Sequence, residues 1–464
     1  MPVNSQHPEY QKVVKRWELV RDIVNNTAKK HIRTVDPSNP TRSETYKDDA
    51  ILTNFTRLTK EGLTGLVFRK PEVIDMPDEM DYIKEDATGT GLTLKQLSRF
   101  VLSDTLVTGR VGLLVDHPRR EFFGSVADDE ILQQLPRIKP YPAESIINWT
   151  TMTVGSKTFI NMVVLVEYLD KLADGFEWEE QIQYRVLFLN ENLEYMQQVF
   201  DDEYMPVGEA MMPLDAEGNP FNYIPFYFVG SENNDWYVDS IPLYDLSVVN
   251  LGHYRNSADY EEAIFICGQP TAIFGGSFDI EEFKNQYGDS VGIGSRAAYY
   301  LGQDPYAAML QPSPNQMVDQ AMKRKEEQAI AIGARLITPS TGRETAEAAK
   351  IRYSSQNSAL HVIVANISIA MEKALMDVAK FLGIEDAEIT YELNRQFYEA
   401  SADPQVIAQQ IMLLDREVLT KNDIRQYLRD NNVIDVDRSD EDIEDDLEIN
   451  TDPLAGIDPD ELGE

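Results

Sequence analysis

The 464-residue sequence predicts an α+β fold, and two observations lead to this prediction. Apolar residues recur at helical spacing up to about residue 110 and again after residue 242. Between these regions, residues 138–230 contain short β-branched and aromatic runs that are separated by turn residues, which is typical of a mostly antiparallel sheet. The hydrophobic content of 42% and charged content of 26% are those of a globular protein with an ample core.

The N-terminal part is expected to be helical. Residues 8–32 have the spacing of an amphipathic helix, and residues 45–68 that of a second helix, which Pro71 stops. Thr93 is expected to cap a third helix, LTLKQLSRFVLSDTLVTG, which runs through a glycine break into the strand RVGLLVDH. The strands expected next are YPAESIINW, FINMVVLVEYLD, IQYRVLFLN and IPFYFVG.

Two helices flank a small insert in the C-terminal half. The first, LYDLSVVNLGHYRNSADYEEAIFIC, is expected to end at Gly268, and the second is NQMVDQAMKRKEEQAIAIGARL. The insert, residues 271–312, is expected to be α/β, with the strands TAIFGG, AAYYLG and YAAML and a short helix, FDIEEFKNQYG. A turn at TPSTGR then opens a helix of about 40 residues that ends at Gly383 and bends at residues 353–358, which are poor in helix formers. A strand, EITYELN, and two further helices follow, the last with Thr420 as its N-cap.

The charge distribution restricts the function. The chain carries 79 acidic and 42 basic residues, a net charge of −37. Residues 1–70 hold 13 basic and 8 acidic residues, so the net charge of the remainder is −42. Static nucleic-acid binding is disfavoured, because such proteins neutralise phosphates with basic residues. A surface past which DNA slides is compatible with this charge.

Compartment signals are few. Cys267 is the only cysteine, so no internal disulfide is expected. The start, MPVNSQHPEYQK, does not read as a signal segment, and no run of 18 apolar residues occurs. The expectation is a soluble protein, intracellular when made, without a membrane partner.

Catalytic motifs are weak. The five histidines are scattered, no P-loop occurs, and the G-x-G-x-x-A match at 292–297 precedes a strand-like run, which favours a loop. One interpretation of Glu167 and Glu180 is a pair of carboxylates for acid–base catalysis. The favoured interpretation places both residues on the surface. The sequence predicts a non-enzyme without a catalytic, cofactor or metal site.

The acidic end of the chain has two readings. Residues 435–464 hold 14 acidic residues and one base, and an EF-hand-like frame begins at Asp435. Asp440 stands where the calcium loop requires glycine, and Asp446 replaces the final Glu. A solvated, mobile acidic tail is favoured over a calcium loop.

Five stretches occur in an order that resembles one family. They are RLTKEGLTGLVFRKP, GLTLKQLSRFVLSDTLVTGRVGLLVD, YPAESIINW, PLYDLSVVNLGHYRNSADYEEAIFICGQPT and GARLITPSTGRETAEAAKIRYSSQNSAL. In this order they resemble the portal proteins of tailed bacteriophages, including a portal-like family known as a domain of unknown function. The resemblance covers residues 7–434, and the order of the stretches is more specific than any one of them.

The resemblance implies a portal fold with a β-rich wing, a helical stem, a small α/β clip, a long kinked wing helix and a helical crown. By position, the wing is 1–241, the stem 242–267 and 314–336, the clip 268–313, the tunnel loop 337–345, the long wing helix 346–384, the crown 385–434 and the acidic tail 435–464.

The resemblance also implies a function and partners. Portal proteins form a ring, here of about twelve copies, at one capsid vertex of a virion assembled in the host cytoplasm. Double-stranded DNA enters through the ring, driven by the terminase large subunit, and later leaves through it. The implied partners are this terminase, a head–tail adaptor, the major capsid protein and scaffold. The expected DNA-channel residues are Thr338, Pro339, Ser340, Thr341, Gly342 and Arg343 in the tunnel loop, and Lys323, Arg324, Lys325 and Arg335 in the stem.

Alternatives remain open at the sequence level. The basic run at 323–325 is equally readable as a solvated helix face paired with Glu326 and Glu327. The apolar residues of the two flanking helices suit either a neighbouring copy in a ring or an intrachain core; they are Leu243, Leu246, Val249, Leu251, Ile264, Ile266, Ile330 and Ile332. Another head–tail adaptor or assembly protein without a DNA channel is the alternative function, and an enzyme with a site in the β-rich region is a third.

Overall fold

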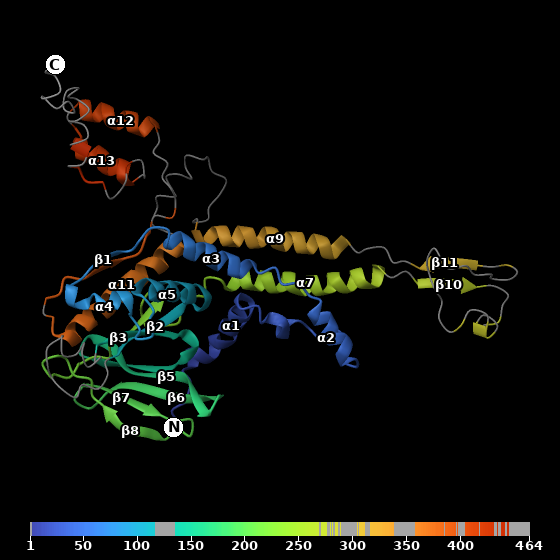
Figure 1. The fold of residues 1–464 in the computed structure, drawn as a ribbon, viewed down its shortest axis with the longest axis horizontal. Coiled ribbons are helices and arrows are strands. Elements are labelled where there is room, and N and C mark those ends of the chain that lie inside the picture. Colours follow the sequence, from blue (N-terminus) through green and yellow to red (C-terminus); the bar gives the residue numbers. More distant parts are fainter. Residues whose placement is uncertain are drawn as a thin grey trace, which may run out of the picture. The chain divides into compact units, whose positions relative to one another are not determined.

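The computed structural model describes residues 2–116, 135–268, 271–275, 306–310, 316–337, 358–384, 386–395, 404–416 and 418–430, with a few single residues between these ranges. The chain forms two compact units, Met1–Arg395 and Gln396–Glu464. Helices and antiparallel sheets both build the first unit, which confirms the predicted α+β class (Figure 1).

The N-terminal helices are shorter than predicted. Helix α1, Pro8–Val24, gives way to a 3₁₀ turn, Ala28–His31, because Asn26 adopts a φ of 61° that a helix cannot contain. The helix predicted over 45–68 is two helices, α2 (Pro40–Asp48) and α3 (Phe55–Val67). Asn54 starts the second of these, since its side chain accepts a hydrogen bond from the backbone N–H of Arg57.

Helix α5, Leu94–Thr108, begins and ends as the sequence predicts. Thr93 forms a capping box with Gln96, in which each side chain bonds the backbone N–H of the other residue. Gly109 ends the helix with a φ of 75°, which glycine adopts without steric cost. The next residue starts a fully buried strand, β2.

The β-rich region is antiparallel, as the sequence predicts, but it consists of two sheets where one was expected. The first has the order β3 (Arg137–Pro142), β2 (Arg110–Asp116) and β9 (Phe226–Gly230). The second is a meander of β4 (Ile146–Val154), β5 (Lys157–Asp174), β6 (Glu177–Leu189), β7 (Tyr195–Phe200) and β8 (Pro206–Met211). Helices α5 and α11 pack on the three-stranded sheet, and their contact contains much of the core.

Helices α7 (Tyr244–Gly268) and α9 (Gln316–Ile337) lie side by side, as Figure 1 shows. Between them in sequence, β10 (Thr271–Gly275) and β11 (Tyr306–Leu310) form a two-stranded antiparallel sheet. These strands match the predictions for TAIFGG and YAAML. The other predicted strand of the insert, AAYYLG, and most of its predicted helix lie outside the described residues.

The long helix predicted up to Gly383 is corrected at Ser358. Helix α11 spans Ala359–Leu382, and Ser358 has an extended backbone whose side chain accepts a hydrogen bond from the N–H of His361. A helix therefore starts here, where one continuous, bent helix was expected. The physical reason is the serine, whose side chain satisfies a free N–H at a helix start better than it supports a helix interior. Residues 346–357 lie outside the described residues.

The remaining elements are short. Strand β12 (Thr390–Glu392) pairs with β1 (Val73–Asp75). Strand β12 is shorter than the predicted strand EITYELN, which contains it. In the second unit, α12 (Pro404–Asp415) precedes α13 (Lys421–Asp430), and the Thr420 hydroxyl accepts a hydrogen bond from the N–H of Asp423, which confirms the predicted cap. The division into wing, stem, clip, tunnel loop, crown and tail stays a prediction.

Candidate functional site

Helices α7 and α9 are held together by a close approach and a buried histidine. The side chain of His253 on α7 is 2% exposed, and its Nε2 lies 3.3 Å from Oε1 of Glu326 on α9. The ring of His253 also packs edge-on against Phe55, with ring centroids 5.1 Å apart. At Gly252, an added Cβ would lie 2.9 Å from Cε of Lys325, so the absence of a side chain lets α9 approach.

The structure places three of the predicted DNA-channel residues together on α9. Lys323 is 67% exposed and forms an ion pair of 2.8 Å with Asp319, one turn earlier; this hydrogen bond raises the pKa of Lys323. Arg324 is exposed, and Lys325 is half-buried against α7. The expected pairing of this run with Glu326 and Glu327 is not found among the described side chains; Lys323 uses Asp319, and Glu326 faces His253.

The side-chain placement of the other predicted DNA-channel residues is not described by the structure. Arg335 belongs to α9, but its side chain lies outside the described part of the chain. The tunnel-loop residues Thr338, Pro339, Ser340, Thr341, Gly342 and Arg343 also lie outside it. Their contact with DNA remains a prediction.

The apolar residues of the helix pair divide into two groups. Leu243, Leu246 and Leu251 are buried, because α7 packs against α1, α2 and α3 of the same chain. The intrachain alternative is therefore correct for these three. Other apolar side chains stay exposed along the two helices, and they are Val248, Ile264, Phe265, Ile266, Met317 and Ile330.

An apolar groove lies between α3 and α9. Its volume is about 510 Å³, and it is lined by Phe55, Leu58, Thr59, Gly62, Leu63, Leu66, Ala329, Ile330 and Gly333. Leu58 is 61% exposed and Ile330 is 73% exposed, although each is a large apolar side chain. Exposed apolar surface of this kind marks an interaction site more often than a catalytic one.

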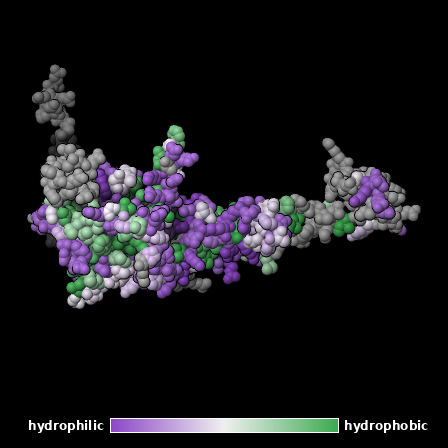
Figure 2. Space-filling view, turned by 90° about the horizontal axis from the view of Figure 1, so that it is seen from below, coloured by the Kyte–Doolittle hydropathy of each residue, from purple (hydrophilic) through white to green (hydrophobic). Residues whose placement is uncertain are grey.

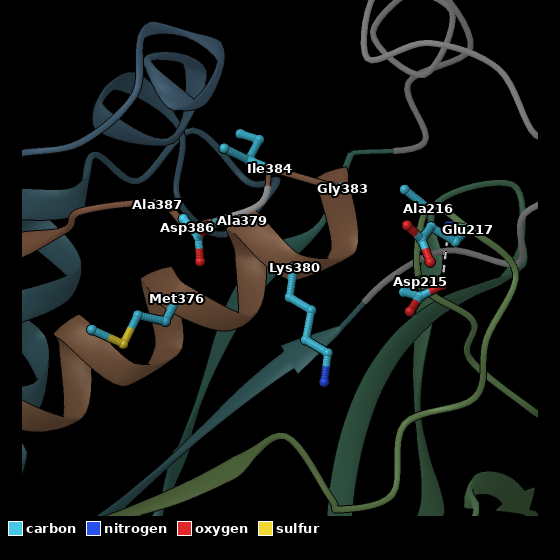
Figure 3. Close-up of a pocket in the computed structure, with 10 residues that line it drawn as sticks. All are labelled: Asp215, Ala216, Glu217, Met376, Ala379, Lys380, Gly383, Ile384, Asp386 and Ala387. Carbon is cyan, nitrogen blue, oxygen red and sulfur yellow. Dashed lines mark hydrogen bonds between the residues drawn. The ribbon is translucent and has the colours of Figure 1, made fainter.

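A second cavity, of about 460 Å³, lies at the C-terminal end of α11 (Figure 3). Lys380 projects from α11, and its Nζ lies 4.8 Å from the ring centroids of both Phe221 and Tyr223. Opposite it, Asp215 accepts hydrogen bonds from the backbone N–H groups of Glu217 and Asn219, which shapes the turn. These polar groups serve the local fold, and the cavity presents no nucleophile–base pair.

The β-rich region contains a buried ionic network, which bears on the enzyme alternative. Arg185 Nε lies 2.7 Å from Glu167 Oε1, and Tyr141 donates a hydrogen bond of 2.5 Å to the same oxygen. Asp116 accepts hydrogen bonds from Lys139 at 2.7 Å and from Gln197 at 3.1 Å. The network joins the two sheets. Glu167 is thus not the surface residue that the sequence analysis expects, because Arg185 compensates its burial.

The ionisation of this network indicates a structural role. Burial alone would raise the pKa of Asp116, but Lys139 and Arg185 outweigh it and hold the pKa below its ordinary value. For Glu167, the hydrogen bond from Arg185 likewise outweighs burial and lowers the pKa. Both groups are therefore paired anions at neutral pH, whereas a general acid or base needs a pKa near the working pH. Glu180, the other candidate carboxylate, is exposed and distant in register from Glu167.

The histidines within the described residues act one at a time. His7 caps α1 and stacks on Trp149 with ring centroids 4.0 Å apart, and His31 Nε2 lies 2.7 Å from Asp22. Among the described residues, no three His, Cys, Asp or Glu side chains are grouped in a way that could hold a metal ion. In the same part of the chain, no helix has the length and apolar character needed to cross a membrane.

Sequence reasoning missed the contacts that depend on distant residues. Asp116 and Arg185 lie on different sheets, and His253 and Glu326 on different helices, so no local pattern marks them. A local signal was present at Asp116, a carboxylate that directly follows the apolar run VGLLV of β2.

Comparisons with known proteins give one family match. Residues 242–382 match a protein family described as a domain of unknown function (DUF4055). The match includes α7, β10, β11, α9 and α11. No similar sequence was found among curated proteins.

Solved structures give further matches. The chain is similar to a chain of the "Virion of native gene transfer agent (GTA) particle", with 13% identity, a TM-score of 0.43, and coverage of 88% of this chain and 98% of that one. A second match is the "Neck of native GTA particle computed with C12 symmetry", with 14% identity, a TM-score of 0.43, and coverage of 84% and 94%. A third is the "Neck of empty GTA particle computed with C6 symmetry", with 14% identity, a TM-score of 0.41, and coverage of 88% and 93%.

Proposed function

We propose that this chain is the portal protein of a tailed bacteriophage. In this proposal about twelve copies form a closed ring at one capsid vertex. Double-stranded DNA passes through the ring during packaging and again during ejection, and the tail or an adaptor attaches to it. The ring performs no chemistry of its own.

The observation that carries the proposal is the exposed apolar surface of the helix pair. Three apolar side chains near the end of α7 are exposed: Ile264 by 49%, Phe265 by 64% and Ile266 by 50%. On α9, Ile330 lines the open groove. A lone chain gains nothing from such residues in water. A closed ring buries them between neighbouring copies and leaves no open end. The order of the five sequence stretches that resemble portal proteins gives independent support.

The small sheet between the helices fits the same proposal. Strands β10 and β11 pair only with each other among the described residues, and two-stranded sheets are marginally stable alone. Pairing or packing with a neighbouring copy would stabilise this clip. Its formation would then depend on assembly.

The charge of the protein suits a channel through which DNA moves better than a surface that binds DNA tightly. A net charge of −37 repels phosphate, and screening limits this repulsion to within about 10 Å of the wall at 0.1 M salt. Lys323, Arg324 and Lys325 would then form local basic rings that guide the strand without reading its sequence. The terminase, the adaptor, the capsid protein and scaffold are the proposed partners, and assembly is proposed to occur in the host cytoplasm before the protein enters the virion.

The native mass of the purified protein, with negative-stain images of the same sample, tests the proposal. The expected result is a ring with a central hole and a mass of about twelve times 52.8 kDa. A folded monomer or dimer across concentrations and salts would contradict it. A compact assembly without a hole would favour the adaptor alternative.

The DNA contact needs its own test. Rings that carry Lys323→Ala, Arg324→Ala and Lys325→Ala together are expected to keep the wild-type mass. Their weak binding of short linear DNA, measured by anisotropy at low salt, should fall and its salt slope should become shallower, since fewer counterions are released. An unchanged salt slope would contradict the prediction that these residues line the DNA channel. The matched control is the surface variant Lys171→Ala on β5.

A further inference from the structure

The long hairpin of β5 and β6 extends beyond its sheet. Strand β4 pairs with β5 only over Lys157–Leu165, and β7 pairs with β6 only over Tyr184–Leu189. Among the described residues, 167–183 therefore form a two-stranded ribbon in which neither edge pairs with a further strand. Figure 2 shows a narrow projection at the horizontal position that the end of β5 and β6 occupies in Figure 1. Unpaired strand edges attract partners.

The two faces of this ribbon differ in charge. On one face, Lys171 stands directly opposite Glu179, and opposite charges in this position stabilise a hairpin. On the other face, Asp170 stands directly opposite Glu180, and like charges there destabilise it. We call this second face the ribbon face; it consists of Tyr168, Asp170, Leu172, Trp178, Glu180 and Ile182.

The composition of the ribbon face suits a cationic partner. Asp170 and Glu180 stand opposite each other and form no ion pair with any described residue, so no described residue compensates their repulsion. The exposed ring of Trp178, 67% accessible, and that of Tyr168 lie on the same face. A lysine or arginine placed between the acids would neutralise them and could lie against these rings. At the tip, Phe176 is 97% exposed, which adds apolar surface to the same projection.

Unused positive charge occurs on α1. Lys12, Lys15 and Arg16 stand at helical spacings of three and four residues, so they share one side of the helix. All three are exposed, and none forms an ion pair with a described residue. Arg16 makes a cation–π contact instead, with its Cζ 5.5 Å from the ring centroid of Tyr244. Other bases of the net-positive segment 1–70 are already paired, as Lys29 is with Asp48 and Arg42 with Glu262.

We propose that the ribbon face of one copy docks on the Lys12–Lys15–Arg16 side of α1 in the next copy. The proposed partner is a second copy of this chain, because residues 1–70 carry 13 basic and 8 acidic residues within a protein of net charge −37 and so complement the acidic ribbon face. Different surfaces of one chain that complement each other make a head-to-tail contact, and such contacts form a ring when the rotation between copies closes. This inference rests on the proposed ring and names one of its contacts.

Two variants with matched chemistry test whether the contact joins different copies. The first chain carries Lys12→Arg and Lys15→Arg, which keeps the charge of α1 but removes its amines. The second carries Asp170→Asn and Glu180→Gln, which removes the ribbon carboxylates and keeps α1. A carbodiimide joins lysine amines to carboxylates that are in contact. In mixed, co-expressed rings the bond can form only from α1 of the second chain to the ribbon of the first.

The expected result is a covalent dimer in mixed rings, with the ribbon peptide joined to the α1 peptide by mass spectrometry. Rings of either variant alone should lack this bond. Adding Glu179→Gln to the first chain should leave the dimer unchanged, because Glu179 lies on the opposite face of the ribbon. The yield should fall several-fold as salt is raised before cross-linking.

Four results would overturn the inference. Wild-type rings without this bond would refute the contact and leave the proposed function standing, as would a bond that forms only within one copy. If the ribbon is cross-linked to a different protein in assembled particles, that protein would be the partner of the ribbon face, and the proposed contact between two copies would be wrong. A wild-type chain that stays monomeric would contradict the proposed function and this contact together.

Discussion

Tyr227 donates a hydrogen bond of 2.6 Å to Asp377, and this contact joins β9 to α11. Tyr223 donates to the other carboxylate oxygen at 2.5 Å, and Asp377 is buried. Replacing it by alanine leaves two hydroxyls without an acceptor, each at a cost of about 1–3 kcal/mol. We therefore expect Asp377→Ala to lower the free energy of unfolding by about 2–5 kcal/mol in denaturant titrations. Tyr223→Phe removes one donor only, and a loss as large as that of Asp377→Ala would contradict this reading.

Asp377 should also make stability depend on pH. Burial raises its pKa, and the two tyrosine hydroxyls oppose this only in part. Because the folded pKa lies above the unfolded value near 4, the folded state holds the proton more tightly. This stabilisation is complete below pH of about 4 and is lost as pH rises through the folded pKa. Asp377→Asn lacks it, so the melting temperature of the wild type relative to this variant should decrease as pH rises. A constant difference would refute the shift.

Glu167 should show the opposite sign. Its pKa is lowered because the hydrogen bond from Arg185 outweighs the effect of burial. The resulting stability is present above the unfolded pKa of about 4.3 and is lost as pH falls through the folded value. We expect Glu167→Gln to cost about 3 kcal/mol at pH 7, and the difference from wild type should shrink on acidification. Exposed Glu179→Gln is the control, and its effect should be small at every pH.

Gly383 is a position where a methyl group is not accommodated. It ends α11 with a φ of 76°, and an added Cβ would lie 2.6 Å from Cβ of Ala216. We expect Gly383→Ala to destabilise the protein by about 1–3 kcal/mol. Gly65 in α3 has nothing within 4 Å of its Cβ position, so Gly65→Ala should stabilise the protein by about 0.5–1 kcal/mol. Thermal unfolding of both variants measures the contrast, and equal effects would contradict it.

Ile330 links the groove to assembly. It is 73% exposed in one chain, so Ile330→Glu should leave helical content and unfolding of the monomer nearly unchanged. In the proposed ring the same change would bury an unpaired charge, and the native mass should shift toward single chains. Gln328→Glu adds the same charge at an exposed polar position on the same helix and should assemble normally. If the Ile330→Glu protein forms rings of normal mass, the groove is not part of the contact between copies.

Local patterns predicted most elements correctly where the signal and its cause lie within a few residues. The Thr93 cap, the Gly109 end of α5, the bounds of α7 and the antiparallel strands all depend on neighbouring side chains and backbone preferences. Failures occurred at breaks inside apolar-periodic segments. Asn26 and Asn54 interrupt predicted helices, and Ser358 starts one, because a short polar side chain satisfies local backbone groups and the hydrophobic period does not report this.

The sequence by itself determined the α+β class, the uneven charge, the two helices around an insert and the resemblance to portal proteins. The tertiary structure decided which apolar residues these helices bury. Leu243 and Leu246 are buried within the chain, whereas Ile264 and Ile330 remain at the surface. It also decided that Glu167 is a paired anion and that Lys12, Lys15 and Arg16 form no ion pair with a described residue. The physical reason is that burial and ion pairing depend on residues far apart in sequence, which are brought together only when the core packs.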